Sequence, residues 1–312
     1  MNLRQPIAIL VMMLYAALTY GQGCSDSGFC TMGAFKPDQP YLKKFNVRLN
    51  SVELTQHLGH TKYGDWIHAT FLDATVGFSN RTSLQVRLPS YAIIVGNMPT
   101  TKGWGDLFLN VSHTVVVREN YRLSITAGAK IYTSRPDKKS EEGIAMPLYQ
   151  QTTVGSNDLS IGGSLITRKW LFAVGYQHAL NRTKNNFNHE DWEGHELENV
   201  VVVYDPSAGL ERGDDIMARV ERNFRLSRFN FYLGGLGLFR IKADKTLNQS
   251  GELAKVAGST GLALNAVTGA GYQFNTRMGI RLLLAFKVKE REANPDGLSR
   301  DFVSQVAYIV RF

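Results

Sequence analysis

SRDFVSQVAYIVRF, residues Ser299–Phe312, decides the fold of this chain. From Phe302 onward the even positions are mostly apolar, whereas the odd positions include Gln305 and Arg311. This period-two alternation is typical of a β-strand with two different faces. In a soluble protein, an edge strand that ends on a bare aromatic residue invites aggregation. In a closed membrane barrel the last strand pairs with the first, and the aromatic side chain lies at the membrane interface. The stretch therefore favours a membrane barrel over a soluble β-sandwich.

The composition agrees with a protein built from many strands. The chain has 312 residues, of which 44% are hydrophobic, yet no apolar run after the first twenty approaches the length of a helical span. A helical span needs about 20 residues. Glycine is abundant, with 29 residues, and aromatic residues make up 11% of the chain. These proportions suit strands with aromatic girdles better than a helical fold.

The N-terminus predicts a targeting segment. Arg4 supplies a positive charge, residues 7–18 form an apolar core, and small and polar residues follow. This order is typical of a signal peptide, which we place at residues 1–22. The predicted organisation is completed by an N-terminal periplasmic or plug-like arm at 23–43 and a barrel at 44–312.

Two cysteines lie in this arm. In an oxidising compartment, Cys24 and Cys30 are candidates for a small disulfide loop, and lipidation of Cys24 is the alternative. The formal net charge of +8 would suggest nucleic acid binding in a cytosolic protein. Here the basic residues are spread along strands and loops without a binding motif, so we expect no nucleic acid partner.

Segments with strand character follow one another from residue 44 to the end. Tight turns follow the second, fourth, sixth, eighth and tenth segments, and longer connections lie between them. A transmembrane barrel with short periplasmic turns and long extracellular loops predicts this alternation, whereas a soluble sandwich does not. The fold class is thus all-β, a closed antiparallel barrel of about twelve strands, at 44–58, 66–79, 83–96, 105–118, 121–133, 157–167, 169–181, 214–226, 229–242, 257–274, 277–289 and the closing stretch.

One face of each strand must look into the barrel lumen. In the eleventh strand, Arg281 and Lys287 share a face, and a charge in mid-bilayer costs about 2–4 kcal/mol on the lipid side. Glu53 and Asp73 could pair with the basic residues across the barrel. The charges are interpreted equally as pore lining or as a salt-bridge network that holds the barrel shut. The candidate lumen residues are Arg122, Lys130, Arg219, Arg240, Lys242, Arg281, Lys287, Lys289 and Arg311, with Glu221.

Three stretches resemble a known family. The segment 102–107, KGWGDL, resembles the G-x-G-D-L segment of the MetA-pathway-of-phenol-degradation family, which is distantly related to FadL-type transporters. Residues 155–162 and 286–312 follow the same family pattern, and Tyr308 and Phe312 resemble the C-terminal insertion signal of bacterial outer-membrane proteins. The resemblance implies an outer-membrane barrel that passes small, often hydrophobic solutes.

The glycines and aspartates of these motifs also have a purely structural interpretation. Gly105 and Gly155 relax the backbone where a loop enters a strand. Asp106 and Asp158 can bond neighbouring backbone donors there. We prefer this interpretation to a role in binding a ligand.

No catalytic motif is present. The longest loop carries an acidic, histidine-bearing stretch, but its two histidines are six residues apart and do not match a helical zinc site. His57 and His60 lie at a turn and give no better case for a metal site. We expect no enzyme activity, no cofactor and no metal, although a hydrolase assembled from distant residues is an open third hypothesis. The stretch contains His189, Glu190, Asp191, His195 and Glu196.

Two functional hypotheses follow. The first is an outer-membrane transporter or diffusion channel of a Gram-negative bacterium for small solutes, hydrophobic or anionic. The alternative is a non-transporting structural subunit of an envelope complex. The expected partners are outer-membrane lipid, the barrel-insertion machinery, a small-molecule solute and, for the alternative, other envelope proteins.

Overall fold

The computed structural model describes residues 48–312. The predicted signal peptide at 1–22, the arm at 23–43 and the cysteine pair Cys24 and Cys30 lie outside the described residues. Within 48–312, no helix has the length and apolar character needed to cross a membrane.

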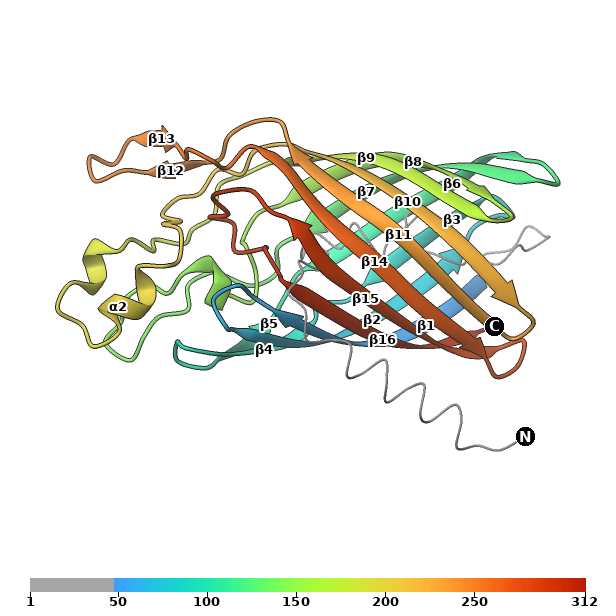
Figure 1. Cartoon of the computed structure of the whole chain (residues 1–312), viewed down its shortest axis with the longest axis horizontal. Helices are drawn as coiled ribbons and strands as arrows, with labels where there is room; N and C mark the ends of the chain where they lie inside the picture. Colours follow the sequence, from blue (N-terminus) through green and yellow to red (C-terminus); the bar gives the residue numbers. More distant parts are fainter. Residues whose placement is uncertain (1–47) are drawn as a thin grey trace.

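A single antiparallel sheet closes on itself to form a barrel (Figure 1). The barrel has twelve strands around its circumference, because β3 with β4 and β5 with β6 each form one interrupted strand. The all-β, twelve-stranded prediction is confirmed. The strands are β1 (Arg48–His60), β2 (Trp66–Gly77), β3 (Thr82–Arg87), β4 (Tyr91–Val95), β5 (Thr101–Trp104), β6 (Leu107–Val117), β7 (Tyr121–Ile131), β8 (Asp158–Thr167), β9 (Trp170–Ala179), β10 (Asp215–Leu226), β11 (Phe229–Arg240), β14 (Gly261–Gln273), β15 (Met278–Lys289) and β16 (Phe302–Arg311).

The closing strand pairs with the first one, as expected from the sequence. β16 runs antiparallel to β1, from Ser51 opposite Arg311 to His60 opposite Phe302. The Phe312 amide extends the ladder by donating to the carbonyl of Asn50 at 3.1 Å. The odd positions of β16 face the interior and the even positions face outward, because the odd side chains are the more buried ones. This arrangement leaves no open edge to aggregate.

Two neighbouring strands of the barrel, β3 with β4 and β5 with β6, are interrupted at adjacent positions. Residues 88–90 separate β3 from β4, and Pro89 in this gap has no amide hydrogen to give to a ladder. Gly105 and Asp106 separate β5 from β6, and the Gly105 amide donates to the Ser90 carbonyl at 2.7 Å. A side chain at residue 105 would place its Cβ 2.5 Å from Ser90 Oγ, so the Ser90 hydroxyl would have to move to admit one. The continuous strand predicted at 83–96 is therefore wrong in detail, whereas the strand predicted at 105–118 is observed as β6 and is preceded by the short β5, which the sequence did not predict.

The connections alternate between short and long. Short turns at 78–81, 118–120, 168–169, 227–228 and 274–277 lie at the end of the barrel that holds the C-terminus (Figure 1). The opposite end carries the longer loops, including 132–157, 180–214, 241–260 and 290–301. These loops hold the short hairpin β12 (Lys245–Leu247) and β13 (Leu253–Lys255), the helix α2 (Glu198–Val201), and the 3-10 turns η2 (Leu148–Gln150) and η3 (Glu190–Trp192). The hairpin was not predicted from the sequence.

The outer wall carries apolar side chains exposed on strand after strand. Leu54, Ile125, Ile161, Val174 and Leu233 belong to five different strands, and all are exposed. A closed barrel with such an outer surface satisfies its backbone internally and presents apolar side chains to lipid. The protein is therefore an outer-membrane β-barrel, with the short turns on the periplasmic side.

Removal of Phe312 should slow insertion. The Phe312 side chain is exposed at the periplasmic end of β16, so its loss removes an interfacial anchor and one ladder bond without opening the lumen. We expect the rate of assembly into liposomes to fall several-fold, as measured by the appearance of heat-modifiable barrel on gels. Solute passage per folded barrel should be unchanged. Equal assembly rates for the deletion variant and the wild type would contradict this.

Candidate functional site

The extracellular loops fold into a compact cap with its own apolar core. Its largest fully buried side chain is Trp192, the last residue of the η3 turn. The indole N–H of Trp192 donates to the Ala145 carbonyl at 3.1 Å. A cap of this kind is held by packing, as a small domain core is. We call the following cluster of buried residues the cap core: Met98, Met146, Tyr149, Phe187, Trp192, Val201 and Tyr204.

A buried hydrogen-bond network joins two loops of the cap. The Tyr204 hydroxyl lies 3.1 and 3.0 Å from the two carboxylate oxygens of Asp65, and Thr61 Oγ1 donates to the same carboxylate at 3.1 Å. Burial raises the pKa of Asp65 above its usual range, and these hydrogen bonds oppose the rise. The Tyr63 ring also packs against Tyr204, with ring centroids 4.6 Å apart. The loop after β1 is thereby fixed to the loop after β9.

Arg240 is the centre of an ionic network beneath the cap. It lies at the end of β11, almost fully buried, and binds Asp215 of β10 in bidentate fashion, with Nε–Oδ1 and Nη2–Oδ2 distances of 2.9 and 2.8 Å. The same guanidinium donates to Asp244 at 2.6 Å and to Asp296 at 2.9 Å. Asp244 and Asp296 come from the loops after β11 and β15, respectively. One arginine thus fixes two extracellular loops to the barrel wall.

Further charges extend this network across the mouth. Arg212 donates to Asp158 at 2.7 Å, and Lys130 Nζ lies 3.2 Å from the same aspartate. Arg291 lies 3.6 and 3.7 Å from the carboxylates of Asp215 and Asp296. We call these residues, with Arg240 and its partners, the mouth network; they are Lys130, Asp158, Arg212, Asp215, Arg240, Asp244, Arg291 and Asp296.

The mouth network leaves little space. Residues Arg240, Arg291 and Asp296 line a cavity of only about 30 Å³. Burial by itself would raise the pKa of Asp296, but the guanidinium groups of Arg240, Arg291 and Arg212 hold that pKa well below its usual range. The carboxylate is therefore charged at neutral pH, and the network is a set of ionic contacts between the barrel wall and the extracellular loops.

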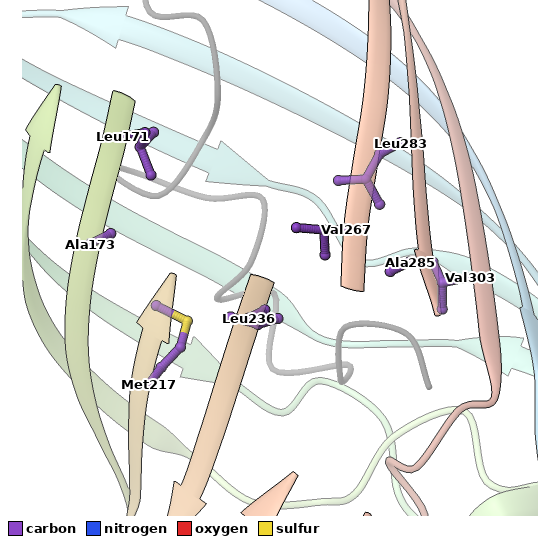
Figure 2. Close-up of a cluster of buried hydrophobic side chains, with 8 residues drawn as sticks. All are labelled: Leu171, Ala173, Met217, Leu236, Val267, Leu283, Ala285 and Val303. Carbon is purple, nitrogen blue, oxygen red and sulfur yellow. The ribbon is translucent and has the colours of Figure 1, made fainter. Parts of the chain in front are cut away.

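An apolar patch covers part of the inner wall deeper in the barrel. Figure 2 shows its side chains on neighbouring strands of one half of the barrel. Among them lies an ion pair on β10, in which Arg219 Nε donates to Glu221 Oε1 at 2.6 Å and both side chains are 0% exposed. The patch, which we call the inner apolar patch, consists of Leu171, Ala173, Met217, Leu236, Val267, Leu283, Ala285 and Val303.

The remaining wall charges pair between strands. Arg281 Nη2 donates to Glu53 at 2.8 Å, so the expected role of Glu53 as a partner for lumen bases is confirmed. Asp73 instead pairs with Arg87 on the adjacent strand, at 3.0 and 3.1 Å. Arg87 escaped the sequence analysis, although its alternation with Gln85 on β3 gives the same inward facing.

Seven of the nine basic lumen candidates lie at inward-facing positions of the barrel. The other two are exposed: Lys242, and Lys289 as the last residue of β15. Lys130 and Arg240 belong to the mouth network, Arg219 lies beside the inner apolar patch, and Lys287 pairs with Asp301. The other three, at inward-facing positions of β7, β15 and β16, are Arg122, Arg281 and Arg311.

Lys242 departs from the expected position. β11 ends at Arg240, so the alternation does not continue to Lys242, whose side chain is 65% exposed. It pairs with Asp214, which also binds the outward-facing Tyr176 and His178, at 2.7 and 2.6 Å. Lys242 therefore lies on the outer surface. Burial opposes ionisation of Asp214, but its bonds to Lys242, His178 and Tyr176 lower its pKa to about 2.

The motif aspartates accept hydrogen bonds from side chains, which the sequence did not predict. Asp106 accepts from Thr153 Oγ1 at 2.7 Å, which attaches the loop segment 151–154 to the interrupted wall. Asp158 accepts from Ser156 at 2.7 Å and from Gln177 at 2.6 Å, in addition to its basic partners. The two residues thus hold loops inside the barrel mouth.

The loop histidines are separated in the cap. His189 bonds the Tyr204 carbonyl at 2.7 Å, and His195 lies 3.2 Å from Glu142. Among residues 48–312, no group of three or more His, Cys, Asp and Glu side chains could hold a metal ion.

Comparison with known proteins identifies the fold. No family model and no curated sequence matches the chain. An outer-membrane channel of the COG4313 type from Pseudomonas putida F1 matches with a TM-score of 0.59 at 11% identity, over 88% of this chain and 99% of that one. The NanC porin (TM-score 0.42, 12% identity, 85% and 100% coverage) and the CymD monoaromatic hydrocarbon channel (TM-score 0.41, 9% identity, 94% of both chains) are less similar.

The shared feature is the fold. At this level of identity the match to the Pseudomonas putida channel shows the fold alone, that of an outer-membrane barrel, which confirms the coarser part of the resemblance. Membership of the MetA-pathway-of-phenol-degradation family is not shown and stays a prediction.

Proposed function

We propose that this protein is an outer-membrane channel or transporter for small solutes, closed at its extracellular end by the cap and the mouth network. The observation that carries the proposal is the position of Arg240. It joins the barrel wall to the loops that bear Asp244 and Asp296, so the extracellular closure depends on a few ionic contacts that could rearrange. A barrel of twelve strands has room for a narrow pore beneath such a closure.

The inner wall favours small solutes that combine an apolar body with a negative charge. The inner apolar patch would contact the apolar part, and arginines at inward-facing wall positions outside the mouth network, such as Arg122 and Arg311, would attract the charge. Recognition of such a solute would need the inner apolar patch for its apolar body and the arginines for its negative charge.

The N-terminal arm at 23–43 is proposed to occlude the lumen in part. The described chain starts at Arg48, on the periplasmic end of β1, so an arm preceding it would enter from that side. Twenty extended residues reach about 65 Å, which exceeds the height of a membrane barrel.

The alternative function, a non-transporting envelope subunit, is favoured by one observation. The acids Glu53, Asp73, Asp215 and Glu221 on the inner wall are each engaged by an arginine, as expected of charges that only hold a barrel together. A structural subunit would conduct nothing and would co-purify with stoichiometric partners.

Liposome swelling separates the two functions. Purified wild-type protein and a variant lacking residues 23–43 are reconstituted at equal density and exposed to small neutral and anionic solutes. We expect slow swelling with the wild type and swelling several-fold faster with the deletion variant, because the arm no longer narrows the lumen. No swelling with either protein, from liposomes shown to contain folded barrel, would contradict the channel and favour the structural subunit.

A further inference from the structure

The periplasmic end of the lumen contains a second cavity, which is larger and richer in arginine than the one beneath the cap. Its volume is about 130 Å³, and it lies between the periplasmic ends of β10, β11, β14, β15 and β16. Four arginines line it: Arg225, Arg228, Arg281 and Arg311. We call this cavity the vestibule.

Among the residues that the structure describes, an acid offsets only one of these charges. Arg281 donates to Glu53 at 2.8 Å. Within residues 48–312, no acidic side chain forms an ion pair with Arg225, Arg228 or Arg311, and the buried Nη1 of Arg311 has no hydrogen-bond partner. This contrasts with the mouth network, where each arginine faces carboxylates.

Two glycines line the vestibule beside these guanidinium groups. Gly271 and Gly279 present no side chains there, and Asn230 Oδ1 lies 2.2 Å from the position that a Cβ on Gly271 would take. Asn230 and Gln273 add amide groups to the lining. A cavity with several forked cationic donors, flanking amides and few acids is suited to a small oxyanion, because guanidinium binds carboxylate and phosphate through paired hydrogen bonds.

We infer that the vestibule is a binding site for a small carboxylate or phosphate anion from solution. The bound anion would offset the charge of Arg225, Arg228 and Arg311 and would supply the acceptor that Arg311 lacks. This goes beyond the proposed channel function, because binding here does not require that anything crosses the membrane.

Thermal unfolding in neutral detergent tests this site. The midpoint is measured in inorganic phosphate and in potassium chloride at equal ionic strength, for the wild type, for the double variant Arg225→Gln/Arg311→Gln and for the control Arg168→Gln. Arg168 is an exposed arginine of another periplasmic turn. Phosphate should raise the wild-type and Arg168→Gln midpoints by about 3–5 °C at tenfold excess over Kd, and should leave the double variant unchanged.

Two results would overturn the inference: no rise in the wild type, or an equal rise in the double variant. A second arm distinguishes a lipid source by comparing phosphatidylglycerol with phosphatidylcholine bicelles without phosphate. A rise produced by phosphatidylglycerol but not by free phosphate would assign the cavity to a lipid headgroup and overturn the soluble anion. A barrel that swells liposomes but shows no phosphate effect would refute the vestibule alone, leaving the channel intact.

Discussion

Arg240→Met should lower the free energy of unfolding by about 3–5 kcal/mol, the cost typical of removing one partner from a buried ion pair. The side chain is buried and its guanidinium binds Asp215, Asp244 and Asp296 together. Methionine fills a similar volume but leaves these carboxylates facing one another with fewer counter-charges. Reversible urea unfolding in lipid vesicles, followed by tryptophan fluorescence, measures the loss.

Lys245→Ala is the matched control for this prediction. Lys245 lies five residues further along the same extracellular connection and pairs with Glu211 at 2.7 Å, but both side chains are exposed. A solvated pair contributes about 0–1 kcal/mol, so the control should change stability little. If Arg240→Met is no more destabilising than Lys245→Ala, the mouth network does not hold the extracellular end together.

Trp192→Ala should open the cap while leaving the barrel folded. The side chain is 0% exposed and packs in the cap core, and truncation of a buried tryptophan typically costs about 3–5 kcal/mol. Because the barrel ladder does not include Trp192, this loss falls on the local stability of the cap. Cleavage of the loop at 180–214 by an added protease should accelerate by about two to three orders of magnitude, because the lost packing energy raises the population of the opened cap.

Val202→Ala controls for the position of the substitution within that loop. Val202 follows α2 and is 58% exposed, so its truncation removes little packing. Its cleavage rate should match the wild type, and heat-modifiable mobility on gels should report intact barrels for both variants. Equal protease resistance of Trp192→Ala and Val202→Ala would show that the cap is not stabilised by its apolar core.

The barrel could be predicted from the sequence because each of its strands has a two-residue alternation of side chains. A strand with lipid on one face and lumen on the other must alternate, and the tight turns must lie on one side, so the stretch at 121–133 and the closing stretch could be assigned residue by residue. The interruption at Pro89 had a local signal as well, since proline cannot donate to a ladder. The interruption at Gly105 has no such local signal, and only the tertiary contact with Ser90 explains it.

The closure of the mouth could not be predicted in the same way. Arg212, Arg291 and Asp296 lie in loops, where no period fixes the facing of a side chain, and their partners come from strands distant in sequence. Lys242 was misplaced for a related reason. Alternation was extended two residues beyond the last ladder position at Arg240, and only the three-dimensional contact with Asp214 shows that the chain has turned outward.

Single-channel conductance in planar lipid bilayers tests whether the cap and the mouth network close a conducting barrel. Wild type, Arg240→Met and Trp192→Ala are inserted from the same detergent, with folded barrel verified by heat modifiability. A channel closed by the cap and the mouth network predicts small, infrequent openings of the wild type and more frequent or larger openings of both variants. The account is contradicted if all three proteins insert as folded barrels and none of them carries current.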